Sequence, residues 1–222
     1  MPMMSGRLSG LAVIGLVVAG SVFARAVAAP VRLLPVDQAA TRPDFFTFRA
    51  QLLTAVARHD ATALMAVVHP NIKCDLGGGE GKAFFEEHWK PAAPDSPVWA
   101  ELATVLALGG TFGTPDTFIA PYVFSRWPQG VDSFEHIAVV GDRVNIRAAP
   151  RADAESMGVS SFEILPLART SVQTPDEWTA VTLASRKIGY IASRFVRSPI
   201  GYRAYFSRQE GRWQMLMFLA GD

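Results

Sequence analysis

The sequence predicts an α+β protein that has a small helical N-terminal region, a small β-barrel and a C-terminal β-hairpin. Between residues 43 and 110, apolar side chains recur at spacings of three and four, which is typical of helices packed on a core. From residue 136 onward, short apolar runs alternate with turn residues, which favours short strands. The chain has 222 residues, which is enough for one or two domains.

The composition is that of a folded protein without a strongly charged partner. Half of the residues are hydrophobic, 18% are charged, and the net charge is +1. Nucleic-acid-binding proteins normally carry a basic surface, so we expect no nucleic-acid partner. Cys74 is the one cysteine, which excludes an intramolecular disulfide and a multi-cysteine metal site. We therefore expect neither a metal nor a cofactor.

Residues 1–28 are typical of an export signal peptide. Arg7 precedes an apolar run from Leu11 to Ala24, which is shorter than the ~20 residues that span a bilayer. Ala26 and Ala28 form the small-x-small pattern read by signal peptidase, so we expect cleavage after Ala28, with Ala26 as the alternative site. An uncleaved membrane anchor is the other interpretation. The cleaved protein would be periplasmic or secreted, without a transmembrane span, and slightly acidic.

Residues 29–40 are rich in Pro and Ala and are predicted to form a loose linker before a helical region over residues 41–133. Pro43 suits a first helical turn. Spacing predicts a helix over Asp44–His59, and Asp60 is a good N-cap for a second helix, Ala61–Val68, which Pro70 would end. We also expect a short strand over Ile72–Cys74, a third helix over Lys82–Trp89 and a fourth from Pro97 to Gly109-Gly110. Residues 111–133, interrupted by three prolines, are predicted to be a connection packed on a domain surface.

Residues 134–200 are predicted to form the barrel. Gly141-Asp142 is a plausible tight turn between strands His136–Val140 and Val144–Arg147. Further strands are expected over Phe162–Leu167, Trp178–Leu183 and Ile188–Ile191. Alternation predicts a core made of Val144, Ile146, Val181, Ile188 and Ile191, with Asn145 and Arg147 pointing away from it.

Residues 201–222 are predicted to form a β-hairpin. Its strands are Arg203–Arg208 and Arg212–Leu219, joined by a loop over residues 209–211. Trp213, Met215, Met217 and Leu219 alternate and would share one face of the last strand. The hairpin packs either on the helical region or on the barrel.

Three motifs in the second half resemble bacterial Src-homology-3 (SH3-like, SH3b-type) domains. Val144-Asn145-Ile146-Arg147-Ala148-Ala149-Pro150 is similar to their first-strand signature, and Trp178-Thr179-Ala180-Val181 to their central strand. Gly189-Tyr190-Ile191 with Arg194-Phe195-Val196 resembles their closing segment. Related modules bind cell-wall peptides, so the resemblance implies an SH3-like barrel that binds a peptide. Ser160-Ser161-Phe162, Ala184–Lys187 and Tyr190 depart from the family pattern, which bears on the peptide groove more than on the barrel.

The helical half has a helix pair, a Gly-Gly-x-x-Gly turn and an F-x-x-x-W helix, with a distant closing strand at Gly211-Arg212-Trp213. In these features it resembles secreted bacterial proteins of unassigned function that carry one such barrel. In addition, the helix pair and the final hairpin are similar to the cone-shaped α+β fold of nuclear-transport-factor-2-like proteins. That second resemblance implies that the hairpin completes the first domain and that the barrel is an insertion.

Cys74 is the obvious candidate nucleophile, because secreted NlpC-type peptidases combine such a barrel with a Cys/His hydrolase. In those enzymes the cysteine begins a helix, where its pKa is lowered. Here Cys74 ends a predicted strand, so we expect a small half-buried side chain and no enzyme. His69 with Cys74, and Glu87 with His88, lack the further ligands of a metal site. The glycines of residues 77–81 lack the ending of a phosphate-binding loop and are predicted to form a turn.

Aromatic side chains in or beside the barrel are the candidate binding residues. These are Tyr122, Trp127, Trp178, Tyr190 and Tyr202. Aromatic grooves on such barrels dock extended peptides, although large aromatics also serve as core. We therefore expect an exported, non-catalytic binding protein of the cell envelope, whose partner is a peptide, a peptidoglycan component or an envelope protein. The alternatives are an assembly partner without a small ligand and an enzyme with a pocket in the helical half.

Overall fold

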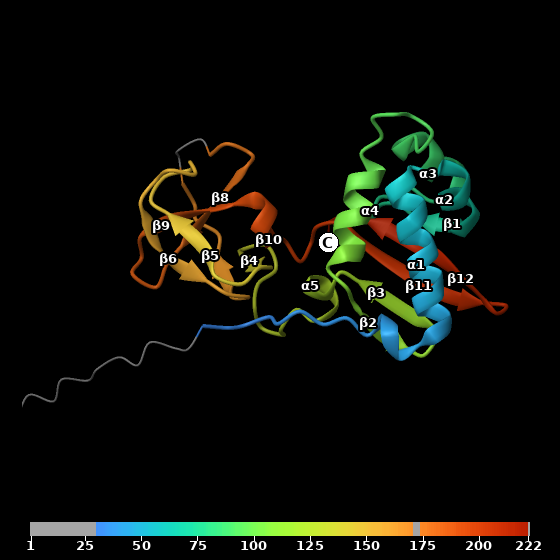
Figure 1. The fold of residues 1–222 in the computed structure, drawn as a ribbon, viewed down its shortest axis with the longest axis horizontal. Coiled ribbons are helices and arrows are strands. Elements are labelled where there is room, and N and C mark those ends of the chain that lie inside the picture. Colours follow the sequence, from blue (N-terminus) through green and yellow to red (C-terminus); the bar gives the residue numbers. More distant parts are fainter. Residues whose placement is uncertain (1–29, 171–173, 222) are drawn as a thin grey trace, which may run out of the picture.

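The computed structural model describes residues 30–170 and 174–221. The predicted signal peptide and its cleavage site at Ala28 lie outside these residues. The mixed α+β class is confirmed. The chain forms two lobes (Figure 1), which we call the α+β unit, made of residues 39–125 and 202–221, and the β unit, made of residues 134–197.

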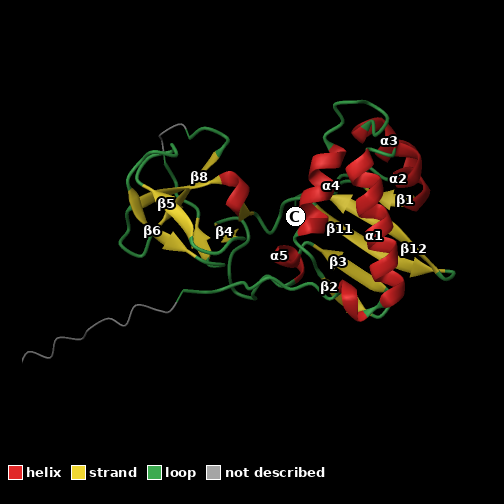
Figure 2. Cartoon of the chain, in the orientation of Figure 1, coloured by secondary structure: helices red, strands yellow, loops and turns green. Residues whose placement is uncertain are grey.

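The α+β unit is a five-stranded sheet with helices packed on one face (Figure 2). The strand order is β1-β12-β11-β3-β2, and β1 pairs with β12 in parallel while the other pairs are antiparallel. The helices are α1 (Pro43–Arg58), α2 (Ala61–Val67), α3 (Lys82–Trp89), α4 (Val98–Ala107) and the short α5 (Tyr122–Ser125). The strands are β1 (Val68–Lys73), β2 (Thr111–Thr114), β3 (Thr117–Ala120), β11 (Arg203–Gln209) and β12 (Arg212–Leu219).

The helix pair follows the local signals of the sequence. Pro43 occupies the first turn of α1, and His59 ends the helix in the left-handed conformation, with φ of 52°. The Asp60 carboxylate then accepts a hydrogen bond from the Ala63 N–H at 2.9 Å and caps α2. Phe45, Leu52 and Val56 lie in the core of the unit, as their spacing predicts.

Two predictions between residues 61 and 133 are wrong. Pro70 does not end a helix; α2 stops at Val67, and Pro70 lies inside β1. This position is tolerated because β1 is an edge strand, where one backbone N–H needs no partner. The stretch predicted as a connection, residues 111–133, instead contains the β2–β3 hairpin and α5. Its strands have four residues each, with Pro115 between them and Pro121 after β3, so no clear alternation marks them.

The C-terminal hairpin lies at the centre of the sheet, between β1 and β3. Its loop is Glu210-Gly211, and both residues have positive φ, as tight hairpin turns require. Trp213 and Met215 share one face, in the core of the unit, as predicted, but Met217 and Leu219 do not belong to this core. A bulge sets Phe206 opposite Met215 and Tyr205 opposite Met217, so the alternation shifts and Phe218 takes the next core position.

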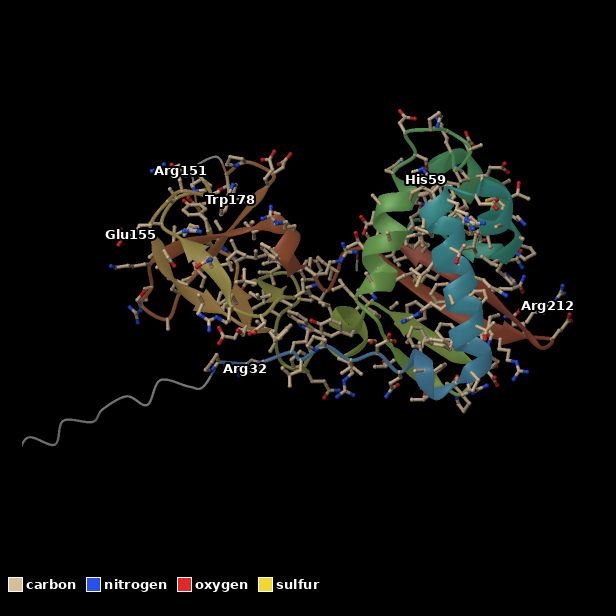
Figure 3. The ribbon with its side chains drawn as sticks, viewed as in Figure 1. Arg32, His59, Arg151, Glu155, Trp178 and Arg212 are labelled. Atoms are coloured by element: carbon tan, nitrogen blue, oxygen red, sulfur yellow. The ribbon has the colours of Figure 1, made fainter. Side chains whose placement is uncertain are left out.

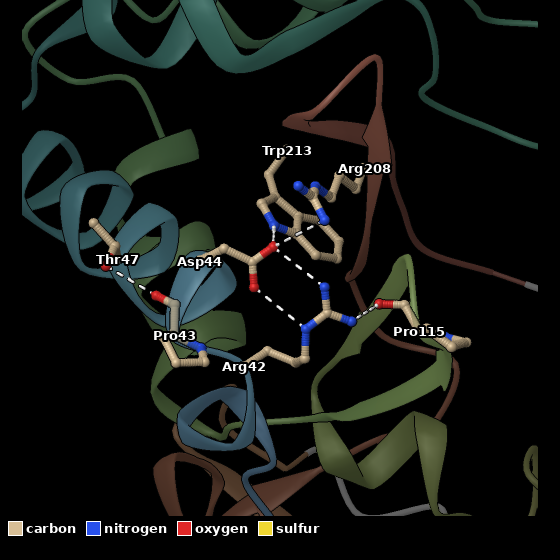
Figure 4. A network of polar contacts seen from close by, with 7 residues as sticks. All are labelled: Arg42, Pro43, Asp44, Thr47, Pro115, Arg208 and Trp213. Atoms are coloured by element: carbon tan, nitrogen blue, oxygen red, sulfur yellow. Dashed lines mark hydrogen bonds and ion pairs between the residues drawn. The ribbon is translucent and has the colours of Figure 1, made fainter.

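Asp44 ties the start of α1 to this hairpin (Figure 4). Its carboxylate accepts hydrogen bonds from the Trp213 indole N–H at 3.1 Å and from the Arg42 guanidinium at 3.3 Å. Arg42 also donates to the Pro115 carbonyl at 2.6 Å, and Arg208 lies 3.6 Å from Asp44. Burial acts to raise the pKa of Asp44, but the hydrogen bonds from Trp213 and Arg42 outweigh it and lower the pKa below its ordinary value.

The β unit is inserted between two neighbouring strands of the five-stranded sheet. Ala120, the last residue of β3, is the register partner of Ala204 in β11. The chain leaves the five-stranded sheet after Ala120 and returns to it before Ala204. The chain leaves through α5 and comes back after β10, so both crossings lie on the side of the α+β unit that faces the β unit (Figure 1).

Two sheets make up the β unit. Strands β10 (Val196–Arg197), β4 (His136–Val139) and β7 (Ile164–Pro166) form one, in that order. Strands β6 (Ser156–Ser160), β5 (Val144–Arg147), β9 (Ile188–Ala192) and β8 (Trp178–Thr182) form the other. Among the described residues neither sheet closes on itself, and a single bridge between Leu167 and Val181 links them.

The core of the β unit contains Val144, Ile146, Val181 and Ile191, as predicted. Ile188 was predicted there and is instead 37% exposed, because it is the first residue of β9 and lies beside the exposed β8–β9 loop. Gly141-Asp142 lies in a turn between two strands, as predicted, but β4 and β5 do not pair as a hairpin, since they belong to different sheets. The turn therefore passes the chain from one sheet to the other. Strand β6 was not predicted, because it is mostly exposed and has no apolar alternation.

Residues 31–38, predicted as a loose linker, form an ordered strap that joins the two units. Val31 and Leu33 exchange backbone hydrogen bonds with Ile164 and Phe162 of the β unit at 2.8 and 2.7 Å. At the other end, the Gln38 N–H donates to the Gly110 carbonyl at 2.9 Å, and its side-chain oxygen accepts from Phe112. A small apolar cluster at the junction contains Leu33, Tyr122, Val123, Ala138 and Ile164.

Within residues 30–170 and 174–221, no helix has both the length and the apolar character needed to cross a bilayer.

Candidate functional site

A cleft of about 180 Å³ opens on the β unit beside strands β5, β8 and β9. Its described lining residues are Asn145, Arg147, Ala152, Trp178, Ala192, Arg194 and Phe195. Asn145 and Arg147 were predicted to point away from the core, and both line this cleft. Figure 3 shows Trp178 and Arg151 toward one end of the β unit, away from Arg32, where the strap enters.

Arg147 lies on β5, between two neighbouring strands that fix its position. Its Cα is the register partner of Tyr190 in β9 on one side and of Ser156 in β6 on the other. Its guanidinium donates to the Ala154 carbonyl at 3.0 Å, and the side chain is half-buried. A guanidinium fixed by one hydrogen bond keeps further N–H donors available in a set direction.

Arg194 and Phe195 form the opposite wall, in the 3-10 turn Ser193–Phe195. The Arg194 guanidinium carbon lies 4.7 Å from the centre of the Phe195 ring, which is a cation–π contact. Phe195 is 37% exposed. The wall thus presents an aromatic surface and a positive charge together.

Of the five aromatic residues predicted to bind a ligand, Trp178 lines this cleft and is half-buried. Tyr190 lies on β9 but is only 8% exposed and is not among the described lining residues of the cleft. The structure therefore assigns Trp178 a position suited to binding and gives Tyr190 a packing position.

The other three predicted aromatics are parts of packed clusters. Tyr122 is 1% exposed in the junction cluster, where burial raises the pKa of its phenol to about 12. Trp127 packs against the same cluster and donates its indole N–H to the Val131 carbonyl at 2.9 Å. Tyr202 stacks on Phe218, with ring centres 5.3 Å apart, in the α+β unit. These three positions fit a structural role, which is the other role that the sequence allowed for large aromatic side chains.

Cys74 is buried and carries a protonated thiol. Burial is the largest cause that raises its pKa to about 11, and the neighbouring Asp75 charge adds to the effect. Its nearest hydrogen-bonding partner is the Ile72 carbonyl, 3.8 Å from Sγ. A thiol in this state is a poor nucleophile at neutral pH.

The glycine-rich loop after Cys74 is organised by Asp75. The Asp75 carboxylate accepts from the backbone N–H groups of Gly77 and Gly79 at 2.8 and 2.6 Å. These N–H groups point at a side chain of the same loop, so the loop forms a turn before α3. In the part of the chain that the structure describes, no three His, Cys, Asp or Glu side chains gather as a metal site would need.

No protein-family model matches the chain, and no curated protein is similar to it. The cleft must therefore be judged on its own residues. Sequence reasoning singled out Trp178 but not Arg194 or Phe195 as binding residues. The signal that could have found them is the motif itself, because Arg194-Phe195-Val196 had been noted only for its resemblance to the closing segment of SH3-like domains.

Proposed function

We propose that this is an exported, non-catalytic binding protein of the cell envelope, whose β unit is an SH3-like barrel that recognises a peptide of the cell wall. The observation that carries the proposal is the cleft that Trp178, Arg147 and Phe195 line together. Its volume, about 180 Å³, is below the ~300–1,000 Å³ of small-molecule pockets. It accommodates one or two residues of a chain better than a cofactor.

The positions of the three SH3-like motifs support the barrel. Their strand residues lie on β5, β8 and β9, which are neighbours in one sheet in the order β5-β9-β8, and the end of the third motif continues through the 3-10 turn to Val196 in β10 of the other sheet. The core draws Ile137 and Val139 from the other sheet and Val144, Ile146 and Val181 from this one. The bridge between Leu167 and Val181 connects the sheets in the way a barrel would.

Sedimentation with purified peptidoglycan tests this function. We expect the protein to sediment with peptidoglycan and Trp178→Ala to reduce the bound fraction severalfold. Phe46→Ala is the matched control, because Phe46 is also an aromatic residue, is 49% exposed and lies on α1 of the other unit. Thermal unfolding of each variant confirms that the fold is kept.

An absence of sedimentation, or equal binding by Trp178→Ala, would leave the role of an assembly partner as the better explanation. The export part has its own test. Intact-mass measurement of the exported protein should show a chain that begins at Ala29, and a mass that includes residues 1–28 would contradict it.

A further inference from the structure

The cleft of the β unit carries two positive charges and no negative one among its described lining residues. Arg147 and Arg194 both line it, and neither has a carboxylate partner within 4.0 Å in the described part of the chain. Asp153, which follows the lining residue Ala152, is already paired with Arg151 at 2.7 Å. The charge of the cleft is therefore available to a ligand.

We infer that the cleft binds a carboxylate group of an extended cell-wall peptide, with Arg147 and Arg194 as its charge partners. This inference rests on the proposed function and names the chemical group that the site selects. Arginine presents paired N–H donors that match a carboxylate, and Arg147 is already oriented by its bond to Ala154. Trp178 and Phe195 supply the apolar contact for the residue that carries the carboxylate.

The two arginines contribute differently. Arg147 is half-buried on the sheet, so its charge is screened less by salt and its direction is fixed. Arg194 is exposed on the 3-10 turn and packs on the Phe195 ring, so its side chain can change conformation to contact the ligand. We therefore expect Arg147 to set the position of the carboxylate and Arg194 to add affinity that decreases as salt concentration rises.

The test uses peptidoglycan in two forms, native and with its carboxylates converted to neutral amides by carbodiimide and ammonia. The protein should sediment with the native form and bind the amidated form about fivefold to tenfold more weakly. Arg194→Gln should lose binding to the native form by a similar factor, while Arg194→Lys should retain part of it. Arg186→Gln is the matched control, because it removes one exposed charge from the β8–β9 loop, outside the cleft lining.

Three outcomes separate the two claims. Selective binding to the native form, weakened by Arg194→Gln but not by Arg186→Gln, supports the inference. Equal binding to both forms, or unchanged binding by Arg194→Gln, overturns the inference and leaves the binding function standing. Binding to neither form overturns the proposed function and the inference together.

Discussion

Arg197 and Glu101 form an ion pair that joins the two units, with Nη2 and Oε1 2.7 Å apart. Arg197 belongs to the last strand of the β unit, and Glu101 lies on α4. The same guanidinium nitrogen donates to the Tyr202 carbonyl at 2.8 Å. The side chains are 15% and 27% exposed, so solvent screens this pair less than it screens an exposed pair.

Removing the Glu101 charge should therefore destabilise the protein measurably. We expect Glu101→Gln to lower the free energy of unfolding by about 1 kcal/mol, because a partly buried guanidinium loses its partner. Glu135→Gln is the control, since its pair with Arg169 is 56% and 91% exposed and should contribute little. Urea unfolding measures both, and equal effects of the two substitutions would contradict the prediction.

Cys74 should be unreactive in the folded protein. Its pKa of about 11 leaves almost no thiolate at pH 8, and the side chain is 7% exposed. Ellman's reagent should label it slowly in buffer and at once in guanidinium chloride. Cys74→Ser gives the background signal. Complete labelling of the folded protein within seconds would show that the thiol is accessible and ionised.

Asp44 should make the protein less stable in acid. Because its folded pKa is lowered, its contribution is fully present above the unfolded value of about 4 and is lost as pH falls through the folded value. Asp44→Asn should be less stable than the parent at neutral pH, and this difference should shrink as pH falls below about 4. Thermal unfolding from pH 7 to pH 2.5 measures it. Asp153→Asn serves as the control in an exposed pair, and a constant difference for Asp44→Asn across this range would contradict the assignment.

Gly110 should not tolerate a side chain. A Cβ at this position would overlap the Ile119 carbonyl oxygen and approach the Phe118 ring to 2.8 Å. We expect Gly110→Ala to lower the free energy of unfolding by about 1–3 kcal/mol, because backbone at the β2–β3 hairpin would have to move. For Gly77→Ala the nearest atom, on Asp75, is 3.7 Å away, so this control should change stability little. Similar losses in both variants would refute the steric explanation.

The helices and the C-terminal hairpin could be predicted from the sequence because each has a local signal. Pro43 and Asp60 mark helix starts, and the spacing of Phe45, Leu52 and Val56 marks a buried face. The errors arose where tertiary contacts decide the structure. Pro70 fits a strand only because β1 is an edge, and the Met217 position depends on a bulge that no local pattern indicates.

The candidate site was predicted only in part, for a similar reason. Trp178, Asn145, Arg147 and Arg194 all lie in recognisable motifs. That Arg194 lines the same cleft as the other three depends on how the strands and the turn after β9 assemble, which no motif shows. Tyr122 and Tyr190 are aromatic residues of a type that binds ligands. Only their burial in the structure shows that they serve in packing.

The pairing of Ala120 with Ala204 affects the order in which the chain can fold during synthesis. Strand β3 cannot meet β11 until the whole β unit has been made, and closing such a long loop is entropically costly. The β unit can fold first, because its strands pair with one another within residues 136–197, and the strap residues 31–33 that also bond to it are made before it. Its first and last strands, β4 and β10, pair with each other through Ala138 and Arg197. Once folded, the β unit therefore keeps its two ends close together, so that the strands before it and the strands after it are already near each other when the five-stranded sheet forms.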